Sequence, residues 1–269
     1  MKIVSDSASN LHALSGVDYA CVPLKILTSA KEYVDTPDLD LNQMIEDLKK
    51  VKGPSSTSCP NVYDWSRAFE GSDAVFAVTI TSNLSGSCSA AMQAASEHPN
   101  AYVIDTLSAG PEMQLQIEFL RDQIQAGKDF ETIKTAIQDY QPHTHLLFSL
   151  ESLNNLARNG RVSHAVAKIA GVLGIRLVGK ASDVGTLEPL HKCRGEQRAL
   201  KTIYEEMKTT GYRGGKVRIA QCLNLNAAQL LKAAIQQDWP QADVEIIPCT
   251  ALCSYYAEQG GLMIGYEDL

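Results

Sequence analysis

"DAVFAVTITSNLSGSCSAAMQAA", residues 73–95, places a continuous apolar run directly before a hydroxyl-rich turn and an alanine-rich helical stretch. Such a short apolar run is typical of a strand that is buried on both faces of a parallel sheet. The same pattern occurs a second time directly afterwards. "AYVID" (101–105) is followed by "TLSAG" and then by a helical stretch that begins at Pro111 and ends before Gly127. Two strand–turn–helix units in succession predict an N-terminal three-layer α/β domain with a mainly parallel sheet.

The turns that leave such strands all lie at the carboxyl edge of the sheet. Three hydroxyl-rich turns each precede a predicted helix, and they contain Thr57 and Ser58; Ser82, Asn83 and Ser85; and Thr106 and Ser108. We expect these turns to converge on one crevice, where hydroxyls and the N–H groups of helix N-termini bind an anion. The alternative is that each turn only caps its own helix, as Ser, Thr and Asn commonly do.

From about His143 the pattern changes. "IRLVGK" and "TLEPLHKCR", joined by "SDVG", predict a hairpin, and alternating helices and strands follow as far as "GLMIGYE". We therefore predict two domains, residues 1–142 and 143–269, the second an α/β domain with a mixed or antiparallel sheet.

Local signals refine the first half. In "YACVPLKI" (19–26), Pro23 predicts an edge or irregular strand, since proline cannot donate to a sheet. Asp40 is the expected N-cap of the helix "DLNQMIEDLKKV", and Pro60 is expected near the first position of the next helix.

Composition narrows the class of protein. The chain has 269 residues and a net charge of -7, which argues against nucleic-acid binding. Residues 158–201 nevertheless carry nine basic and three acidic residues. This local excess of positive charge predicts either a surface that binds an acidic partner or a phosphate, or side chains that are only solvated. We expect no membrane span, no signal peptide and a cytoplasmic location, because no apolar run approaches about 20 residues and the start is polar. The seven scattered cysteines do not predict a disulfide framework.

Motifs for chemistry are sparse. The chain contains neither GxxxxGK[ST] nor GxGxxG, so nucleotide binding is disfavoured. "NLSGS" keeps open a small-molecule hydrolase that uses Ser85, although GxSxG is absent. "HTH" (143–145) could offer two metal ligands on one strand face, but surface or hydrogen-bonded histidines are favoured and no metal site is predicted. The hydroxyl-rich turns best suit a bound carboxylate, since they supply no acid or base.

Several stretches together resemble the DegV family of bacterial fatty-acid-binding proteins: "DSASN", "TSCP", "TSNLSGSCSAA", "VIDTLSAG", "LNNLARNGRVSHAVAKIAGVLGIRLVGK" and "GTLEPLHKCRGEQRAL". The resemblance spans essentially the whole chain. It implies a non-enzymatic, two-domain protein that holds a long-chain fatty acid in a tunnel, with the carboxylate near the domain interface and no cofactor besides this ligand. Some members carry the acyl chain for a separate ATP-binding kinase subunit. Carriage of another carboxylate is the alternative within this class.

The resemblance also implies site residues. Thr57, or its neighbour Ser58, and Ser85 would bind the carboxylate, and Asn83 and the Gly86 backbone would line the same pocket. Arg161 in "NGRVS" and Arg194 in "HKCRGEQR" match basic positions of the family and would contact the head group or the partner.

One motif departs from the family. Many members have a Gly-Thr-His-Val-Gly-Pro-Gly-like stretch near the C-terminus, whose histidine approaches the head group. This chain has Ser254, Tyr255 and Tyr256 in the corresponding region. A tyrosine hydroxyl can replace one hydrogen bond of that histidine but not its positive charge.

Overall fold

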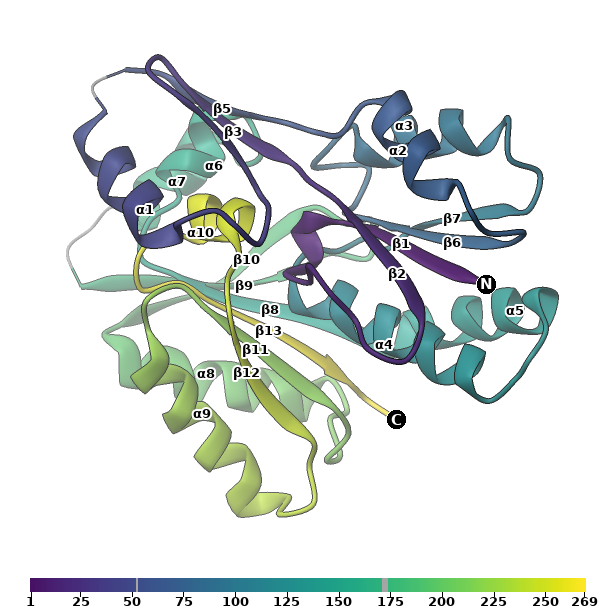
Figure 1. The fold of residues 1–269 in the computed structure, drawn as a ribbon. Helices are drawn as coiled ribbons and strands as arrows, with labels where there is room; N and C mark the ends of the chain where they lie inside the picture. The colour runs from purple at the N-terminus through teal and green to yellow at the C-terminus, as the bar shows by residue number, and fades with distance from the viewer. Residues whose placement is uncertain (52, 171–173) are drawn as a thin grey trace.

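The computed structural model describes residues 1–51, 53–170 and 174–269, and its elements stack in layers (Figure 1). The first sheet is parallel, in the order β2-β1-β6-β7. Its strands are β1 (Lys2–Asp6), β2 (Asp18–Val22), β6 (Val75–Thr79) and β7 (Ala101–Asp105). The helices on its two faces are α2 (Val62–Phe69) and α3 (Ser87–Ala95) on one, and α4 (Pro111–Gln125) and α5 (Phe130–Tyr140) on the other. The predicted three-layer parallel domain is therefore confirmed.

Alternating strand residues produce these layers. Val4 and Ala77 pack in the core with α2 and α3, whereas Ile3 and Phe76, their neighbours along the chain, pack in the core with α4 and α5. Because successive strand side chains point to opposite faces, a strand that is apolar at every position must be covered on both sides. This is the physical basis of the continuous apolar run at β6.

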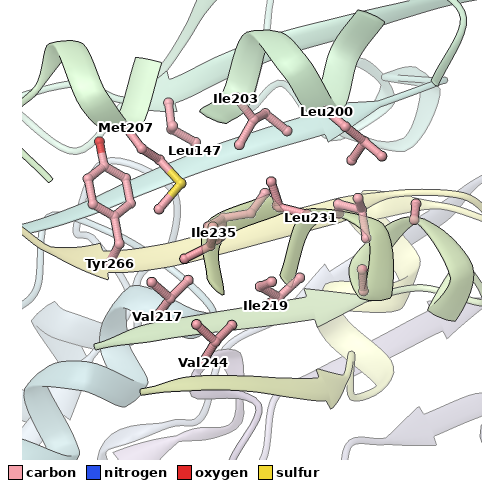
Figure 2. Close-up of a cluster of buried hydrophobic side chains, with 14 of the residues drawn as sticks. Leu147, Leu200, Ile203, Met207, Val217, Ile219, Leu231, Ile235, Val244 and Tyr266 are labelled. Carbon is pink, nitrogen blue, oxygen red and sulfur yellow. The ribbon is translucent and has the colours of Figure 1, made fainter. Parts of the chain in front are cut away.

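The second sheet is mixed, in the order β10-β9-β8-β13-β11-β12, and only its β11–β12 pair is parallel. Its strands are β8 (Thr144–Leu150), β9 (Ile175–Ala181), β10 (Leu187–Arg194), β11 (Val217–Gln221), β12 (Val244–Pro248) and β13 (Leu262–Glu267). Helices α8 (Glu196–Thr209) and α9 (Leu225–Asp238) cover one face through a large apolar core (Figure 2).

Helix α4 covers the opposite face of this sheet as well as the first sheet, so the two sheets share it (Figure 1). Gly265 on β13 permits the close approach, since a Cβ there would lie 2.4 Å from the carbonyl carbon of Pro111.

A small antiparallel sheet, β4-β3-β5, joins the two halves of the chain. Its strands are β3 (Lys25–Thr28), β4 (Glu32–Val34) and β5 (Ser55–Ser58). The remaining elements are η1 (Ser7–Ser9), α1 (Leu41–Lys50), η2 (Gln141–His143), α6 (Asn154–Arg158), α7 (His164–Ala170) and α10 (Ala251–Ala257). Helix α10 comes from the second half of the sequence but packs against β3, α1 and η1 (Figure 1). This sheet and α10 were not predicted.

Hydrogen bonds hold α10 in place. The carboxylate of Asp35, which is 1% exposed, accepts from the N–H of Ala251 at 3.0 Å and of Leu252 at 3.1 Å. Asn10 accepts from the N–H of Thr250 at 2.9 Å. The donors at the start of α10 are therefore satisfied by residues more than two hundred positions away in the sequence.

The local predictions had mixed outcomes. Asp40 is the N-cap of α1 and accepts from the Gln43 N–H at 3.0 Å, as predicted. The first part of "YACVPLKI" is an edge strand, as predicted, since β2 lies at the edge of the first sheet; β3 begins after Pro23 in another sheet, because proline breaks the pairing. Pro60 lies ahead of the α2 N-cap rather than inside the helix, since Asn61 forms a capping box there.

Among the described residues, no helix combines the length and the hydropathy needed to cross a bilayer. The domain boundary at residue 142 stays a prediction. The strands of the first sheet precede it and those of the second sheet follow it.

Candidate ligand-binding site

A cavity of about 270 Å³ lies between the first sheet, the small sheet, α10 and the α4-facing side of the second sheet. Most of its lining is aliphatic or aromatic carbon, and its polar groups gather around β5 and the start of α3. The lining residues outside the polar end include Ala8, Leu24, Ile80, Leu84, Ala109, Leu146, Phe148, Leu150, Leu156, Leu187, Leu252, Ala257 and Met263. An apolar chamber with polar groups at one end suits an amphipathic ligand.

Hydroxyl groups form one side of the polar end. Thr57 and Ser58 are the last residues of β5. The Thr57 Oγ1 and the Tyr256 hydroxyl lie 2.7 Å apart in a hydrogen bond that joins β5 to α10. Burial raises the pKa of Tyr256, so its hydroxyl is neutral and can donate one hydrogen bond.

Arg161 supplies positive charge to the polar end. Its Nε donates to the carbonyl oxygen of Leu84 at 2.8 Å, and its Nη1 donates to that of Asn159. Among the described residues, no hydrogen-bond partner contacts Nη2. The guanidinium is thus fixed beside the turn before α3, with one nitrogen available to a ligand.

The start of α3 forms the other side. Gly86 precedes the helix, and a Cβ there would lie 3.2 Å from the Cys59 Sγ, so glycine keeps β5 and α3 close together. Ser85 lies just before it, and its Oγ accepts from the Ser87 N–H at 3.3 Å. Ser85 and Gly86 both line the cavity, so the Ser85 hydroxyl lies beside the positive end of the α3 helix dipole.

A buried carboxyl group, that of Asp6, holds the turn between β6 and α3 in place. Asp6, at the end of β1, accepts from the Ile80 N–H at 2.9 Å and from the Ser87 hydroxyl at 2.7 Å. Burial raises the pKa of Asp6 to about 6. The chain from β6 to α3 is consequently anchored at both ends, which fixes the position of Ser85.

The structure brings most of the predicted site residues together. Thr57, Ser58, Ser85, Gly86 and Arg161 all line the cavity. Their roles toward a ligand stay predictions.

Two predicted residues lie outside the lining. The Asn83 side chain points to the β9–β10 hairpin, where its Nδ2 donates to the Val184 carbonyl at 2.6 Å. Arg194 ends β10 and is exposed. Asn83 therefore holds the tip of the hairpin against the first sheet, and the ligand contacts predicted for Asn83 and Arg194 stay predictions.

The third hydroxyl-rich turn also serves the fold rather than the cavity. Thr106 Oγ1 donates to the Thr79 carbonyl at 2.8 Å, and the Ser108 hydroxyl hydrogen-bonds Glu112. Both side chains are buried, and this turn contributes only Ala109 to the lining. The expected convergence of three turns therefore holds for two of them.

The structure separates the three residues of the departing motif. Tyr256 faces the cavity, whereas the hydroxyl of Tyr255 bonds Ser55 at 2.7 Å and Asn159 at 3.0 Å. Ser254 is buried and donates to the Cys249 carbonyl at 3.2 Å. The sequence could not choose among them, because the α10 helix that orients them was not predicted.

Neither catalytic alternative gains support from the geometry. No histidine occurs among the described residues that line the cavity with Ser85. His143 and His145 both bind Asp268, at 2.8 and 2.9 Å, so this pair has a structural partner. Within the described ranges, no group of three or more His, Cys, Asp or Glu residues is arranged to hold a metal ion.

Comparison with known proteins gives a consistent result. The family model described as "Uncharacterised protein, DegV family" matches residues 1–268. A DegV domain-containing protein of Streptococcus pneumoniae is 42% identical over 276 residues, covering 99% of this chain and 98% of its own.

Two solved structures are similar over the whole chain, each with a TM-score of 0.97 and 42% identity. One is a DegV family protein from Eubacterium eligens loaded with heptadecanoic acid, and the alignment covers 100% of both chains. The other is the Fatty Acid Kinase (Fak) B3 protein of Streptococcus pneumoniae loaded with linoleic acid, with 100% of this chain and 99% of that chain covered. The chain belongs to the DegV family.

Proposed function

We propose that this protein binds a long-chain fatty acid, with the acyl chain in the cavity and the carboxylate at its polar end. The observation that carries the proposal is the division of the cavity into an aliphatic chamber and one polar end formed by Thr57, Ser58, Ser85, Arg161 and Tyr256. The fatty acids bound to the two similar proteins at 42% identity support it.

The chamber supplies most of the affinity. Burial of each methylene contributes about 0.8 kcal/mol, so a long acyl chain gains on the order of 10 kcal/mol before the costs of ordering it. The hydroxyls of Thr57 and Ser85 then orient the carboxylate, and Arg161 with the α3 N-terminus offsets its charge.

The carboxylate end lies toward the surface, since Gly86 is exposed and Ser85 is half-buried. We infer that the protein presents the carboxylate to a separate ATP-binding subunit, in keeping with the name of the Fak B3 relative. This chain then acts as the acyl-binding partner and needs no cofactor of its own. A cytoplasmic location fits the seven free cysteines, since thiols persist in a reducing compartment.

The test is to identify the lipid that co-purifies with the protein by native mass spectrometry. A bound fatty acid is expected in the wild type and should be lost from Ala109→Leu, which fills the chamber. Ala126→Leu, at an exposed position, is the matched control and should retain the lipid. Absence of fatty acid from the wild type, together with no binding of added fatty acid to delipidated protein, would refute the proposal.

A further inference from the structure

A second cavity, of about 580 Å³, adjoins the fatty-acid cavity. The cavity lies where the pairing between β8 and β9 ends. The paired residues run from Leu150, opposite Leu177, to Leu147, opposite Lys180. Beyond Lys180 the β9–β10 hairpin leaves β8, and the opening between them is lined from both sides of the sheet. Leu146, on β8, borders both cavities.

Leu146 lies at the far end of the first cavity from the carboxylate groups. The side chains of Leu146, Phe148 and Leu150 share one face of β8 and line that cavity. Leu150 ends the strand, and the chain then leads through α6 to Arg161. At about 3.3 Å per residue, Leu146 is about 13 Å along the strand from Leu150.

The residues next to Leu146 do not border both cavities. Met263, which lies on β13 opposite Phe148, lines only the first cavity. Gly110 at the start of α4 packs against the Met263 side chain, since a Cβ on Gly110 would lie 2.6 Å from Met263 Cε. Leu147 lines only the second cavity and packs toward α8 (Figure 2). Leu146 is the shared wall.

We propose that Leu146 sets the length of the acyl chain that this protein accepts, by closing the distal end of the fatty-acid cavity against the second cavity. The inference rests on the proposed function. Because Leu146 borders both cavities, truncation of its side chain is expected to join them and to give a longer acyl chain room. A larger side chain at the same position shortens the chamber.

The experiment measures the binding of saturated fatty acids of increasing length to delipidated wild type, Leu146→Ala and Leu147→Ala. Both leucines are 2% exposed and adjacent on β8, so Leu147→Ala controls for loss of core packing. In Leu146→Ala the preferred chain is expected to lengthen by at least two methylenes, each favoured by roughly fourfold. Leu147→Ala should keep the wild-type preference.

Two other substitutions of Leu146 test the same inference. Should Leu146→Ala not fold, Leu146→Val must shift the preference in the same direction, and Leu146→Phe must shift it toward shorter chains. An unchanged length preference in the folded Leu146 variants that bind fatty acid would overturn this inference alone. Failure of the wild type to bind any fatty acid would overturn both the inference and the proposed function.

Discussion

Two buried glutamates on α4 should respond in opposite ways to neutralisation. Glu112 is 5% exposed, and the hydroxyls of Ser108 and Thr144 hydrogen-bond it, Thr144 at 3.0 Å. Burial raises the pKa of Glu112 from 4.5 to about 7. Glu118 is 4% exposed and bonds Arg218 twice, at 2.9 and 2.7 Å. The ionised form of Glu112 is therefore destabilised by burial, whereas the negative charge of Glu118 is paired with the guanidinium of Arg218.

The substitution Glu112→Gln removes this penalty and keeps both hydrogen bonds, because the amide oxygen accepts from Thr144 and the amide nitrogen donates to Ser108. Between pH 4.5 and about 7, folded wild type binds more protons than unfolded chain, so its free energy of unfolding falls as pH rises. The pKa shift corresponds to about 3 kcal/mol, fully present above pH 7 and absent below 4.5. The variant should therefore equal wild type near pH 4.5 and exceed it by about 3 kcal/mol at pH 8.

Urea unfolding at a series of pH values, with matched lipid content, measures this difference. The other titrating groups, including Asp6, are common to both proteins and cancel in the comparison. Glu118→Gln is the control and should lose about 1–3 kcal/mol at pH 8, because it removes the buried carboxylate partner of Arg218 and leaves the exposed carboxylates of Asp243 and Glu245. If the difference between Glu112→Gln and wild type stayed constant from pH 5 to pH 8, the assignment of a buried, uncompensated carboxyl group would be wrong.

Three further substitutions test the site and its scaffold. Thr57→Val removes the hydroxyl that bonds Tyr256 and should weaken fatty-acid binding by roughly 2- to 10-fold in calorimetry; an unchanged dissociation constant would exclude Thr57 from the head-group site. Asp35→Ala leaves the N–H groups of Ala251 and Leu252 unpaired and should lower the urea unfolding free energy by about 2–4 kcal/mol, whereas a neutral result would show that water replaces the carboxylate. Gly185→Ala, at a φ of +77° and with its Cβ 2.1 Å from Thr81 Oγ1, should release the hairpin tip and speed amide exchange over residues 182–186; unchanged exchange would contradict that packing.

The sequence predicts the parallel sheet because its signals are local. The apolar run of β6, the hydroxyl-rich turn and the helix after it follow one another within 23 residues. The N-cap at Asp40 is equally local, since its partner Gln43 lies three positions later. Periodicity and capping chemistry depend on neighbours along the chain, which one sequence displays directly.

Helix α10 illustrates what the sequence could not predict. Its seven residues are too few for a clear helical period, and Asp35 satisfies its first N–H groups from the other end of the chain. The orientation of Tyr256 toward the cavity depends on this helix. Asn83 and Ser85 show the same limit, because two residues of one turn point to different partners once the β9–β10 hairpin docks there.

In the proposed function, the polar end of the cavity holds a ligand with one negative charge. Among the described lining residues, Arg161 is the one cation, and two of its nitrogens already donate to main-chain carbonyls. Tyr256 adds a neutral hydroxyl group, because burial raises its pKa. The α3 N-terminus adds a partial positive charge of roughly half an elementary unit. A carboxylate is balanced by these groups, whereas an acyl phosphate carries more negative charge than they offset. In the proposed function, phosphorylation of the carboxylate would therefore weaken the hold of the site on its ligand.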